Sequence, residues 1–180
     1  MRQLLLLRHA KSSWDETSLS DHDRPLNARG RRTASIMRQA MRDLGLQPDI
    51  VFVSAARRTQ ETMELLEPWD ETPLIEPMES LYLADVPHLL SVLRGVAETA
   101  RSVMFIGHNP GLHDMALTLV GQETLENHAI VHHAPLRGLT QGFPTGALAE
   151  FTVPGLWSEV GPGTARLVRF LTPRDIGGAD

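Results

Sequence analysis

Three short apolar runs, each followed closely by a basic or imidazole side chain, constrain the fold of this chain most strongly. Apolar runs of this length are typical of buried strands. The runs and the side chains that follow them are 4–7 with Arg8 and His9, 50–54 with Arg58, and 103–107 with His108. Open α/β sheets bind their ligands at the carboxyl ends of the strands. The sequence therefore predicts that two arginines and two histidines meet at one sheet edge and form a phosphate site.

The segments between these runs carry helical periodicity. Strands are predicted at 3–8, 50–54, 103–107, 147–153 and 166–171, and helices at 29–44, 58–66, 86–100 and 111–120. Asn27 is the predicted N-cap of the first helix, and Gly45 is its predicted C-terminal stop. Strands that alternate with helices favour a three-layer α/β/α fold with a mostly parallel sheet. The last two strands have no helix between them, so we expect an antiparallel pair at the edge of that sheet.

Length and composition indicate one domain with an aliphatic core. The chain has 180 residues, of which 42% are hydrophobic and only 5% aromatic. A chain of this length is sufficient for a single domain with a substantial core. Residues 1–173 are predicted to form that domain, and residues 174–180 a C-terminal tail that frays.

Charge and residue usage argue against several functional classes. The net charge of −5 disfavours a general nucleic-acid binder. The chain has no cysteine, which excludes disulfides, thiolate catalysis and zinc–thiolate sites. The apolar run at 4–7 is too short to span a membrane, and Arg8 closes it before a signal-peptide core could form. The sequence therefore favours a soluble, cytoplasmic protein, and it does not indicate an oligomeric state.

Four motifs follow one another in a recognisable order: Arg8-His9, then the segments 21–26, 54–62 and 107–111. In these motifs the chain resembles the histidine phosphatase superfamily, which includes cofactor-dependent phosphoglycerate mutases and acid phosphatases. It looks most similar to the small SixA-like phosphohistidine phosphatases, and the resemblance extends over residues 1–173. It implies a phosphoglycerate mutase-like fold, in agreement with the α/β/α architecture predicted from the strand and helix pattern.

The resemblance also implies roles for the residues at the strand ends. His9 would be the nucleophile that carries a transient phosphoryl group, which divides hydrolysis into two displacements without a metal or other cofactor. Arg8, Arg58 and His108 would hold the phosphate oxygens, since arginine presents planar and permanently charged donors. Arg58 fits the family spacing better than Arg57, because the family's arginine lies four residues after the serine and four before the threonine.

Two further basic residues are candidates for phosphate binding. Arg24 lies in the 21–26 motif, where Asp21 could orient it or an active-site histidine; the alternative is a surface ion pair that only fixes the loop. Lys11 is the single lysine among 17 basic residues and follows His9 by two positions. It is either a rim residue that attracts phosphate or a surface lysine without a role.

The general acid that would protonate the leaving group has several candidates. Glu79 lies in the region that matches the acid of the mutase branch, and Asp85, Asp15 and Asp21 are alternatives. Imidazole released from phosphohistidine needs less protonation than an alkoxide does. The weak acid signal therefore favours a phosphohistidine substrate. By analogy with the family, the short segment between Arg58 and Glu79 predicts an open pocket that admits a phosphate on a protein surface.

A separate group of histidines, His128, His132 and His133, raises the question of a metal. No carboxylate is suitably spaced to complete a zinc site with them. The glycines and the proline that follow favour a loop, so we interpret these histidines as solvated side chains near the pocket mouth. His22 is interpreted as a surface residue without a chemical role. The sequence thus predicts no metal site.

These observations predict a metal-independent phosphatase that removes phosphate from phosphohistidine of a protein. One alternative is a phosphomonoesterase that uses the same residues on a small metabolite or nucleotide. Another is a non-catalytic module that binds phosphorylated partners, although the intact set of Arg8, His9, Arg58 and His108 argues against it. The expected partner is a phosphorylated protein or a small phosphorylated substrate, with no nucleic acid and no membrane.

Overall fold

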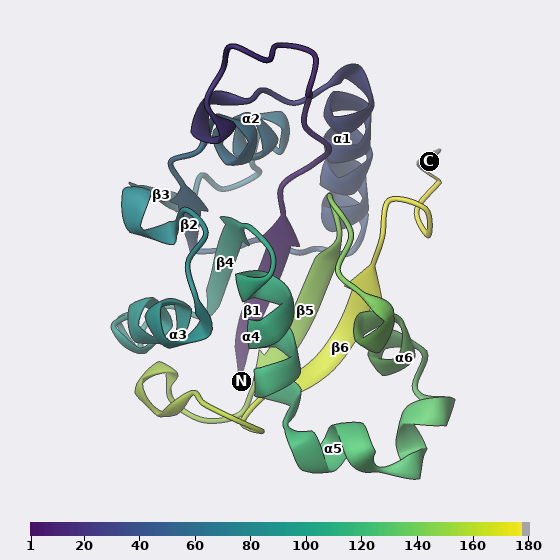
Figure 1. Cartoon of the computed structure of the whole chain (residues 1–180). Coiled ribbons are helices and arrows are strands. Elements are labelled where there is room, and N and C mark those ends of the chain that lie inside the picture. The colour runs from purple at the N-terminus through teal and green to yellow at the C-terminus, as the bar shows by residue number, and fades with distance from the viewer. Residues whose placement is uncertain (178–180) are drawn as a thin grey trace.

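A six-stranded sheet with helices on both faces forms the protein (Figure 1). The computed structural model describes residues 1–177, without the side chains of His128 and Ala129; the end of the predicted tail, residues 178–180, lies outside it. The strands are β1 (Arg2–Arg8), β2 (Ile50–Ser54), β3 (Leu74–Met78), β4 (Ser102–Gly107), β5 (Leu148–Val153) and β6 (Arg166–Leu171). The helices are α1 (Ala28–Asp43), α2 (Arg57–Leu65), α3 (Val86–Arg94), α4 (Gly111–Val120), α5 (Gln122–Glu126) and α6 (Ala134–Gln141).

The strands lie in the order β3-β2-β4-β1-β5-β6. Strands β1, β2, β3 and β4 are parallel, whereas β5 runs antiparallel to both β1 and β6. This confirms the predicted three-layer fold, with its mostly parallel sheet and its antiparallel edge. Since β2, β4 and β1 are parallel neighbours, their carboxyl ends meet at the same edge of the sheet.

Strand β1 contributes to both apolar cores because its leucines alternate between the two faces. Leu4 and Leu6 pack in the core beneath α3, α4 and α6, and Leu5 and Leu7 pack in the core beneath α1 and α2. All four leucines are buried, as expected for a central strand covered on both sides. The leucine run therefore fixes the point at which the chain leaves the sheet, immediately before His9.

The sequence pattern does not indicate β3 or α6. Strand β3 is an edge strand with mostly exposed side chains and Pro77, so it lacks an apolar run. The prediction of a loop where α6 lies was wrong. His133 caps this helix, its Nδ1 accepting from the Leu136 amide at 3.2 Å. Gly138 serves close packing, because an added Cβ would lie 3.1 Å from the Phe170 ring.

Two predicted boundaries also differ from the structure. The predicted C-terminal end of the helix at 86–100 was wrong, because α3 ends at Arg94 and Gly95 is its C-cap. In the described part of the predicted tail, residues 174–177 lie in turns, and Ile176 packs against the core beneath α1 and α2.

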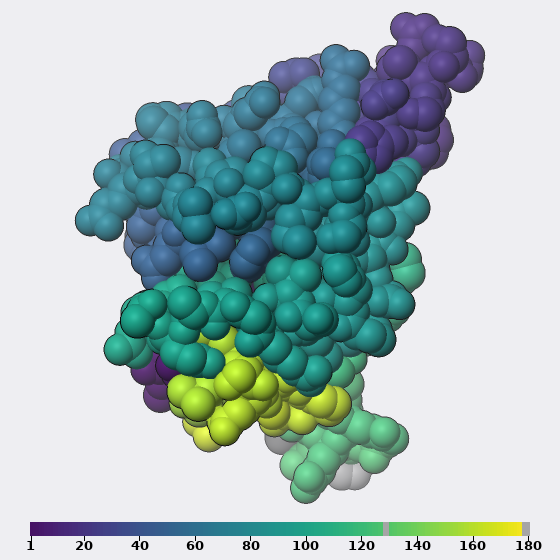
Figure 2. Space-filling model, turned by 90° about the vertical axis from the view of Figure 1, so that its left-hand side faces the viewer, coloured from purple at the N-terminus to yellow at the C-terminus, as the bar shows by residue number. Residues whose placement is uncertain are grey.

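The segment between β1 and α1 is long and projects from the molecule (Figure 2), but its base is tightly held. The Asn27 amide donates to the Lys11 carbonyl at 3.0 Å, and the Asn27 side chain accepts from the Gly30 amide at 2.8 Å, which confirms the predicted N-cap. An added Cβ at Gly30 would lie 2.1 Å from the Lys11 carbonyl oxygen. The first turn of α1 therefore presses directly on the backbone that follows His9.

Replacing Gly30 by alanine should destabilise the fold by about 1–3 kcal/mol, since the clash is with backbone atoms that cannot rotate away. Urea unfolding measures this change. Gly95→Ala is the matched control: an added Cβ there meets its nearest atom at 3.5 Å, so the free energy of unfolding should change by less than about 1 kcal/mol. Equal unfolding midpoints for the two variants would contradict the close approach at Gly30.

Candidate active site

His9 lies directly beyond the end of β1, and its ring has a fixed tautomer. The ring nitrogen Nδ1 lies 2.7 Å from the Ala10 carbonyl oxygen. Because a carbonyl only accepts, Nδ1 carries the proton in the neutral ring. Nε2 is then unprotonated, and it accepts from Nε of Arg58 at 3.3 Å. The local backbone therefore holds His9 in the form whose Nε2 has the lone pair that a nucleophile needs.

The two imidazoles of the site are held neutral by their surroundings. Burial is the largest cause that lowers the pKa of His9 from 6.5 to about 3, and the charge of Arg58 contributes. Burial, followed by the charge of Arg58, also lowers the pKa of His108 to about 3. A neutral imidazole keeps its lone pair, so His9 is a competent nucleophile at neutral pH.

His108 follows β4 and faces His9, with 5.3 Å between the ring centroids. Its Nδ1 accepts from Nη2 of Arg58 at 3.4 Å, so its Nε2–H donates to the Ser54 hydroxyl at 2.7 Å. Ser54 is the last residue of β2. The ends of β1, β4 and β2 thus meet at one point, where each contributes a polar side chain.

Arg58 is the central cation of the site and is only 3% exposed. It lies in the first turn of α2, where Nη1 donates to the Asp21 carbonyl at 2.6 Å and Nη2 to the Asp21 carboxylate at 3.1 Å. Its neighbour Arg57 is about half exposed and pairs with Glu61 at 3.4 Å. The structure therefore places Arg58 in the site and leaves Arg57 at the surface, as the family spacing indicates.

Arg8, at the last position of β1, is a further cation of the site and is partly buried. Its Nη1 donates to the Phe143 carbonyl at 3.0 Å, and the Asn109 amide donates to the same carbonyl at 2.8 Å. Burial and the charge of Arg58 lower the pKa of Arg8. Two neighbouring guanidinium groups that repel each other are stabilised by an anion near both. The electrostatics of the site thus favour phosphate.

Asp21 connects the cations of the site. Its Oδ1 accepts from Nε and Nη2 of Arg24, each at 3.1 Å, and its Oδ2 accepts from Arg58 and from the Tyr82 hydroxyl. The hydrogen bond from Tyr82 is the largest cause that lowers the pKa of Asp21 to about 2, and Arg58 and Arg24 add to it. These bonds favour the ionised form of Asp21, which argues against it as the general acid.

Arg24 and Lys11 both reach the site, in different ways. Besides Asp21, the Arg24 guanidinium donates to the Ser12 hydroxyl at 2.6 Å and stacks at 3.5 Å on the ring of Trp14. Most N–H groups of Arg24 thus donate to other protein groups. Arg24 therefore holds the Asp21 carboxylate and also forms part of the cavity wall. Lys11 is exposed at the rim of the cavity.

A cavity of about 250 Å³ joins these side chains. Six of the predicted site residues line it: Arg8, His9, Lys11, Arg24, Arg58 and His108. Trp14 and Leu83, which are 72% and 54% exposed, form an apolar part of its rim. The sequence predicts Trp14 only as a packing or rim residue, and it does not indicate Leu83. Their signal in the sequence is weak, because an exposed apolar residue in a loop has no periodic pattern.

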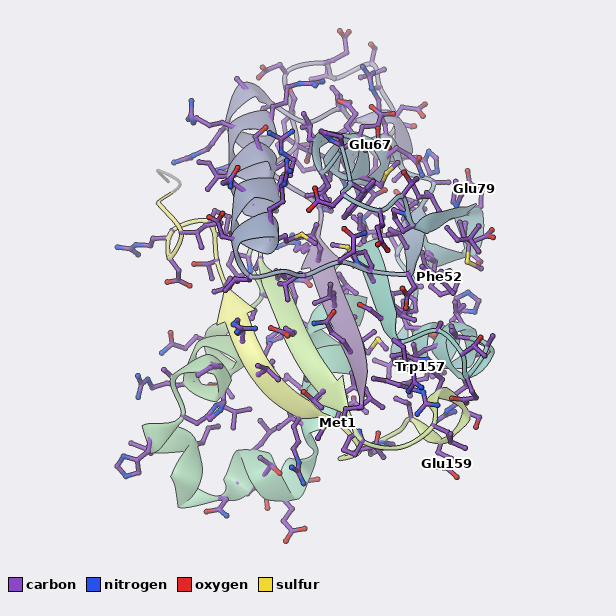
Figure 3. The ribbon with its side chains drawn as sticks, turned by 180° about the vertical axis from the view of Figure 1, so that it is seen from behind. Met1, Phe52, Glu67, Glu79, Trp157 and Glu159 are labelled. Atoms are coloured by element: carbon purple, nitrogen blue, oxygen red, sulfur yellow. The ribbon has the colours of Figure 1, made fainter. Side chains whose placement is uncertain are left out.

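Glu79 does not line this cavity. Its side chain is 73% exposed and lies 3.0 Å from Nε2 of His22, and Figure 3 shows it beside the outer end of β3. Among the alternative acids, Asp85 caps α3 by accepting from the His88 amide at 3.1 Å, and Asp15 is exposed. Within the described part of the chain, no carboxylic acid lines the cavity around His9.

No group of three or more histidine, aspartate or glutamate side chains in the described residues could hold a metal ion. His133 is engaged as the N-cap of α6, while the side chain of His128 lies outside the described residues. Nor is any described helix long and apolar enough to cross a membrane.

A larger groove of about 1140 Å³ adjoins the cavity. Arg8, Lys11, Asn109 and Thr145 line both of them. The groove extends from these residues along α6 and the end of β6, where Gly138 and Phe170 form part of its wall. The phosphate pocket therefore opens into a wide surface depression.

Comparison with known proteins agrees with this geometry. The family model of the histidine phosphatase superfamily (branch 1) matches residues 4–79. An uncharacterized chloroplast protein of Arabidopsis thaliana is 35% identical over 135 residues, which cover 67% of this chain and 60% of that protein. The chain therefore spans less than two thirds of the length of this relative.

Two further relatives match over nearly the whole chain. An uncharacterized protein of Mycobacterium tuberculosis is 30% identical over 171 residues, which cover 93% of this chain and 100% of that protein. A solved structure from Nakamurella multipartitia, assigned as a phosphohistidine phosphatase SixA, superposes with a TM-score of 0.80 at 26% identity and covers 96% of both chains. The chain belongs to the histidine phosphatase superfamily.

Proposed function

We propose that this protein is a metal-independent phosphatase that passes the phosphoryl group through His9, and that its substrate is phosphohistidine on a protein. The observation that carries the proposal is the neutral His9 ring, whose Nε2 lone pair faces Arg58 at 3.3 Å while Nδ1 donates to the Ala10 carbonyl. Family membership and the similarity to a structure assigned as a phosphohistidine phosphatase support it.

The first displacement transfers the phosphoryl group to His9. The Nε2 lone pair attacks phosphorus, and the bond between phosphorus and the substrate nitrogen breaks. A phospho-imidazole that is protonated on its other nitrogen leaves as neutral imidazole. In this step the Nε group of Arg58 turns from Nε2 to a phosphoryl oxygen, while its Nη1 and Nη2 bonds to Asp21 keep the guanidinium in place.

The second displacement regenerates the nucleophile. Water attacks phosphorus, the bond from phosphorus to Nε2 breaks, the electron pair returns to Nε2, and phosphate and a proton are released. Throughout the cycle Nδ1 keeps its proton because it donates to the Ala10 carbonyl. His9 therefore leaves as a neutral imidazole, and this step requires no general acid.

Two features of the site support a phosphohistidine substrate. In the described part of the chain, no carboxylic acid lines the cavity, which suits a leaving group that needs little protonation. The groove of about 1140 Å³ that shares Arg8, Lys11, Asn109 and Thr145 with the cavity offers room for a polypeptide next to the phosphate.

One observation favours a second candidate, a phosphomonoesterase. His22 pairs with Glu79 at 3.0 Å, and its ring lies 4.9 Å from the ring of Tyr82, which in turn lies 5.4 Å from His108. An acid–imidazole pair at this distance could supply a proton to an alkoxide at the mouth of the pocket. His22 therefore lies nearer to the active-site side chains than we expect for a surface residue without a chemical role.

The proposal is tested by turnover of phosphohistidine protein, free phosphohistidine, sugar phosphates and p-nitrophenyl phosphate. His9→Ala should lose activity on every substrate because no nucleophile remains, and His88→Ala, whose ring contacts only Ser80 among the described polar groups, should keep it. Rapid quenching of the wild type with labelled substrate should trap the phosphoryl group on His9. Full activity of His9→Ala would refute the mechanism.

Arg58→Lys should weaken the binding of inorganic phosphate and slow turnover, each by about tenfold or more, because lysine cannot reproduce a planar, bidentate contact. Isothermal titration gives the affinity, and steady-state kinetics give the rate. The matched control is Arg57→Lys at the exposed neighbouring position, which should leave both values unchanged. Similar effects of the two substitutions would contradict the placement of Arg58 at the phosphate.

Glu79→Gln separates the two candidate functions. With phosphohistidine the rate should stay within about threefold of wild type, because imidazole is a good leaving group. The control is Glu76→Gln, at an exposed position of β3. If the variant instead lost about 10²–10⁴ on an alkyl phosphate that the wild type hydrolyses well, Glu79 would act as a general acid and the phosphomonoesterase would be favoured.

A further inference from the structure

Arg58 depends on a residue that lies in a short, partly exposed turn. Asp21 binds Arg58 through both its main-chain carbonyl and its carboxylate. However, its side chain is 44% exposed, and it lies in a 3₁₀ turn of three residues within the long segment between β1 and α1. Something outside that segment has to keep the turn over the pocket if Arg58 is to stay in position.

Tyr82 makes this connection. Its hydroxyl donates to Oδ2 of Asp21, the same oxygen that accepts from Arg58. It belongs to a different part of the chain from Asp21, because it directly follows the 3₁₀ turn η2 (Glu79–Leu81) after β3. The ring also lies edge-on to His108, at 5.4 Å and 86°, and its centroid lies 5.8 Å from the Arg58 guanidinium carbon. A single side chain thus contacts the anchor of Arg58 and lies beside both Arg58 and His108.

The backbone around Tyr82 is fixed in a way that a loose surface loop would not be. Leu83 has a φ of 51°, in the left-handed region that a leucine seldom adopts. The next residue, Ala84, has its carbonyl oxygen so close to Gly111 that an added Cβ there would lie 2.0 Å away. Gly111 begins α4, three residues after His108. Strained backbone persists only where packing determines it, so the position of Tyr82 is set by the fold.

We infer that Tyr82 is a positioning residue: its hydroxyl holds the Asp21 carboxylate, and through it the Arg58 guanidinium, at the phosphate pocket. The inference rests on the proposed function, because it assigns Arg58 to the phosphate. It extends that function to a residue whose contact with the phosphate is indirect. The hydrogen bond from Tyr82 also lowers the pKa of Asp21, together with Arg24 and Arg58, which are the charged groups that bond to the carboxylate.

The test is a double-mutant cycle on the intact chain with Tyr82→Phe and Asp21→Ala, read out by the affinity for inorganic phosphate. Tyr82→Phe keeps the ring and should weaken binding about threefold to tenfold, the range of one net hydrogen bond. In the Asp21→Ala background, where no carboxylate remains to accept from Tyr82, the same change should have almost no further effect. Ser80→Ala, which removes a hydroxyl from the same turn that bonds to His88, is the control and should bind phosphate like the wild type.

A second readout reports on Asp21 directly. The carbon-13 titration of the Asp21 carboxyl group should move to higher pH in Tyr82→Phe and stay unchanged in Ser80→Ala. Additive losses in the cycle, or an unmoved Asp21 titration, would overturn the inference. Because phosphate binding requires no turnover, lack of activity on phosphohistidine leaves this test intact. A phosphate affinity that is insensitive to Arg58→Lys would instead refute the proposed site.

Discussion

The hydrogen bonds between Arg58 and Asp21 are the interaction on which the rest of the site depends. A guanidinium that is 3% exposed cannot remain in a protein without fixed acceptors, and Asp21 supplies two of them, at 2.6 Å and 3.1 Å. Held in this way, Arg58 faces the unprotonated nitrogens of His9 and His108. Its charge adds to the effect of burial, which is the main reason that the pKa values of both rings are lowered. The ion pair therefore contributes to the geometry of His9 and to its neutral state.

The sheet determines where this ion pair can form. Because β1, β4 and β2 are parallel neighbours, Arg8, His108 and Ser54 lie at the same edge of the sheet, whatever the conformation of the loops. The loop segments then add what the strands lack, namely the acidic partner in the 3₁₀ turn Asp21–Asp23 and the apolar rim at Trp14 and Leu83. The strands thus supply the proposed phosphate ligands, and the connecting segments supply the surroundings of the cavity.

Much of the fold and of the site could be predicted because short stretches of sequence indicate the buried strands and the polar residues that follow them. The leucine run of β1 and the apolar run of β4 are buried on both faces, so strand ends and the polar residues that follow them stand out in the sequence. Strand β3 has no such signal, since an edge strand with Pro77 buries little. The contact between Tyr82 and Asp21 joins positions 61 residues apart, and no local pattern encodes it. Glu79 was a candidate general acid because of its place in the family motif. Its pairing with His22 outside the cavity also joins distant positions, so no local pattern could indicate it.

The alternating leucines of β1 have a consequence for how the site withstands thermal fluctuation. Arg8 and His9 continue a strand whose Leu4 to Leu7 side chains are almost fully buried in two cores, so their amides exchange with solvent only when the whole domain opens. Asp21 and Trp14 lie in a projecting segment with few apolar anchors, which is expected to open on its own at much lower cost. His9 and the Asp21 carboxylate that supports Arg58 therefore belong to units of unequal local stability. Mild heating or denaturant would detach the Asp21 side of the pocket while the strand that carries His9 is still intact.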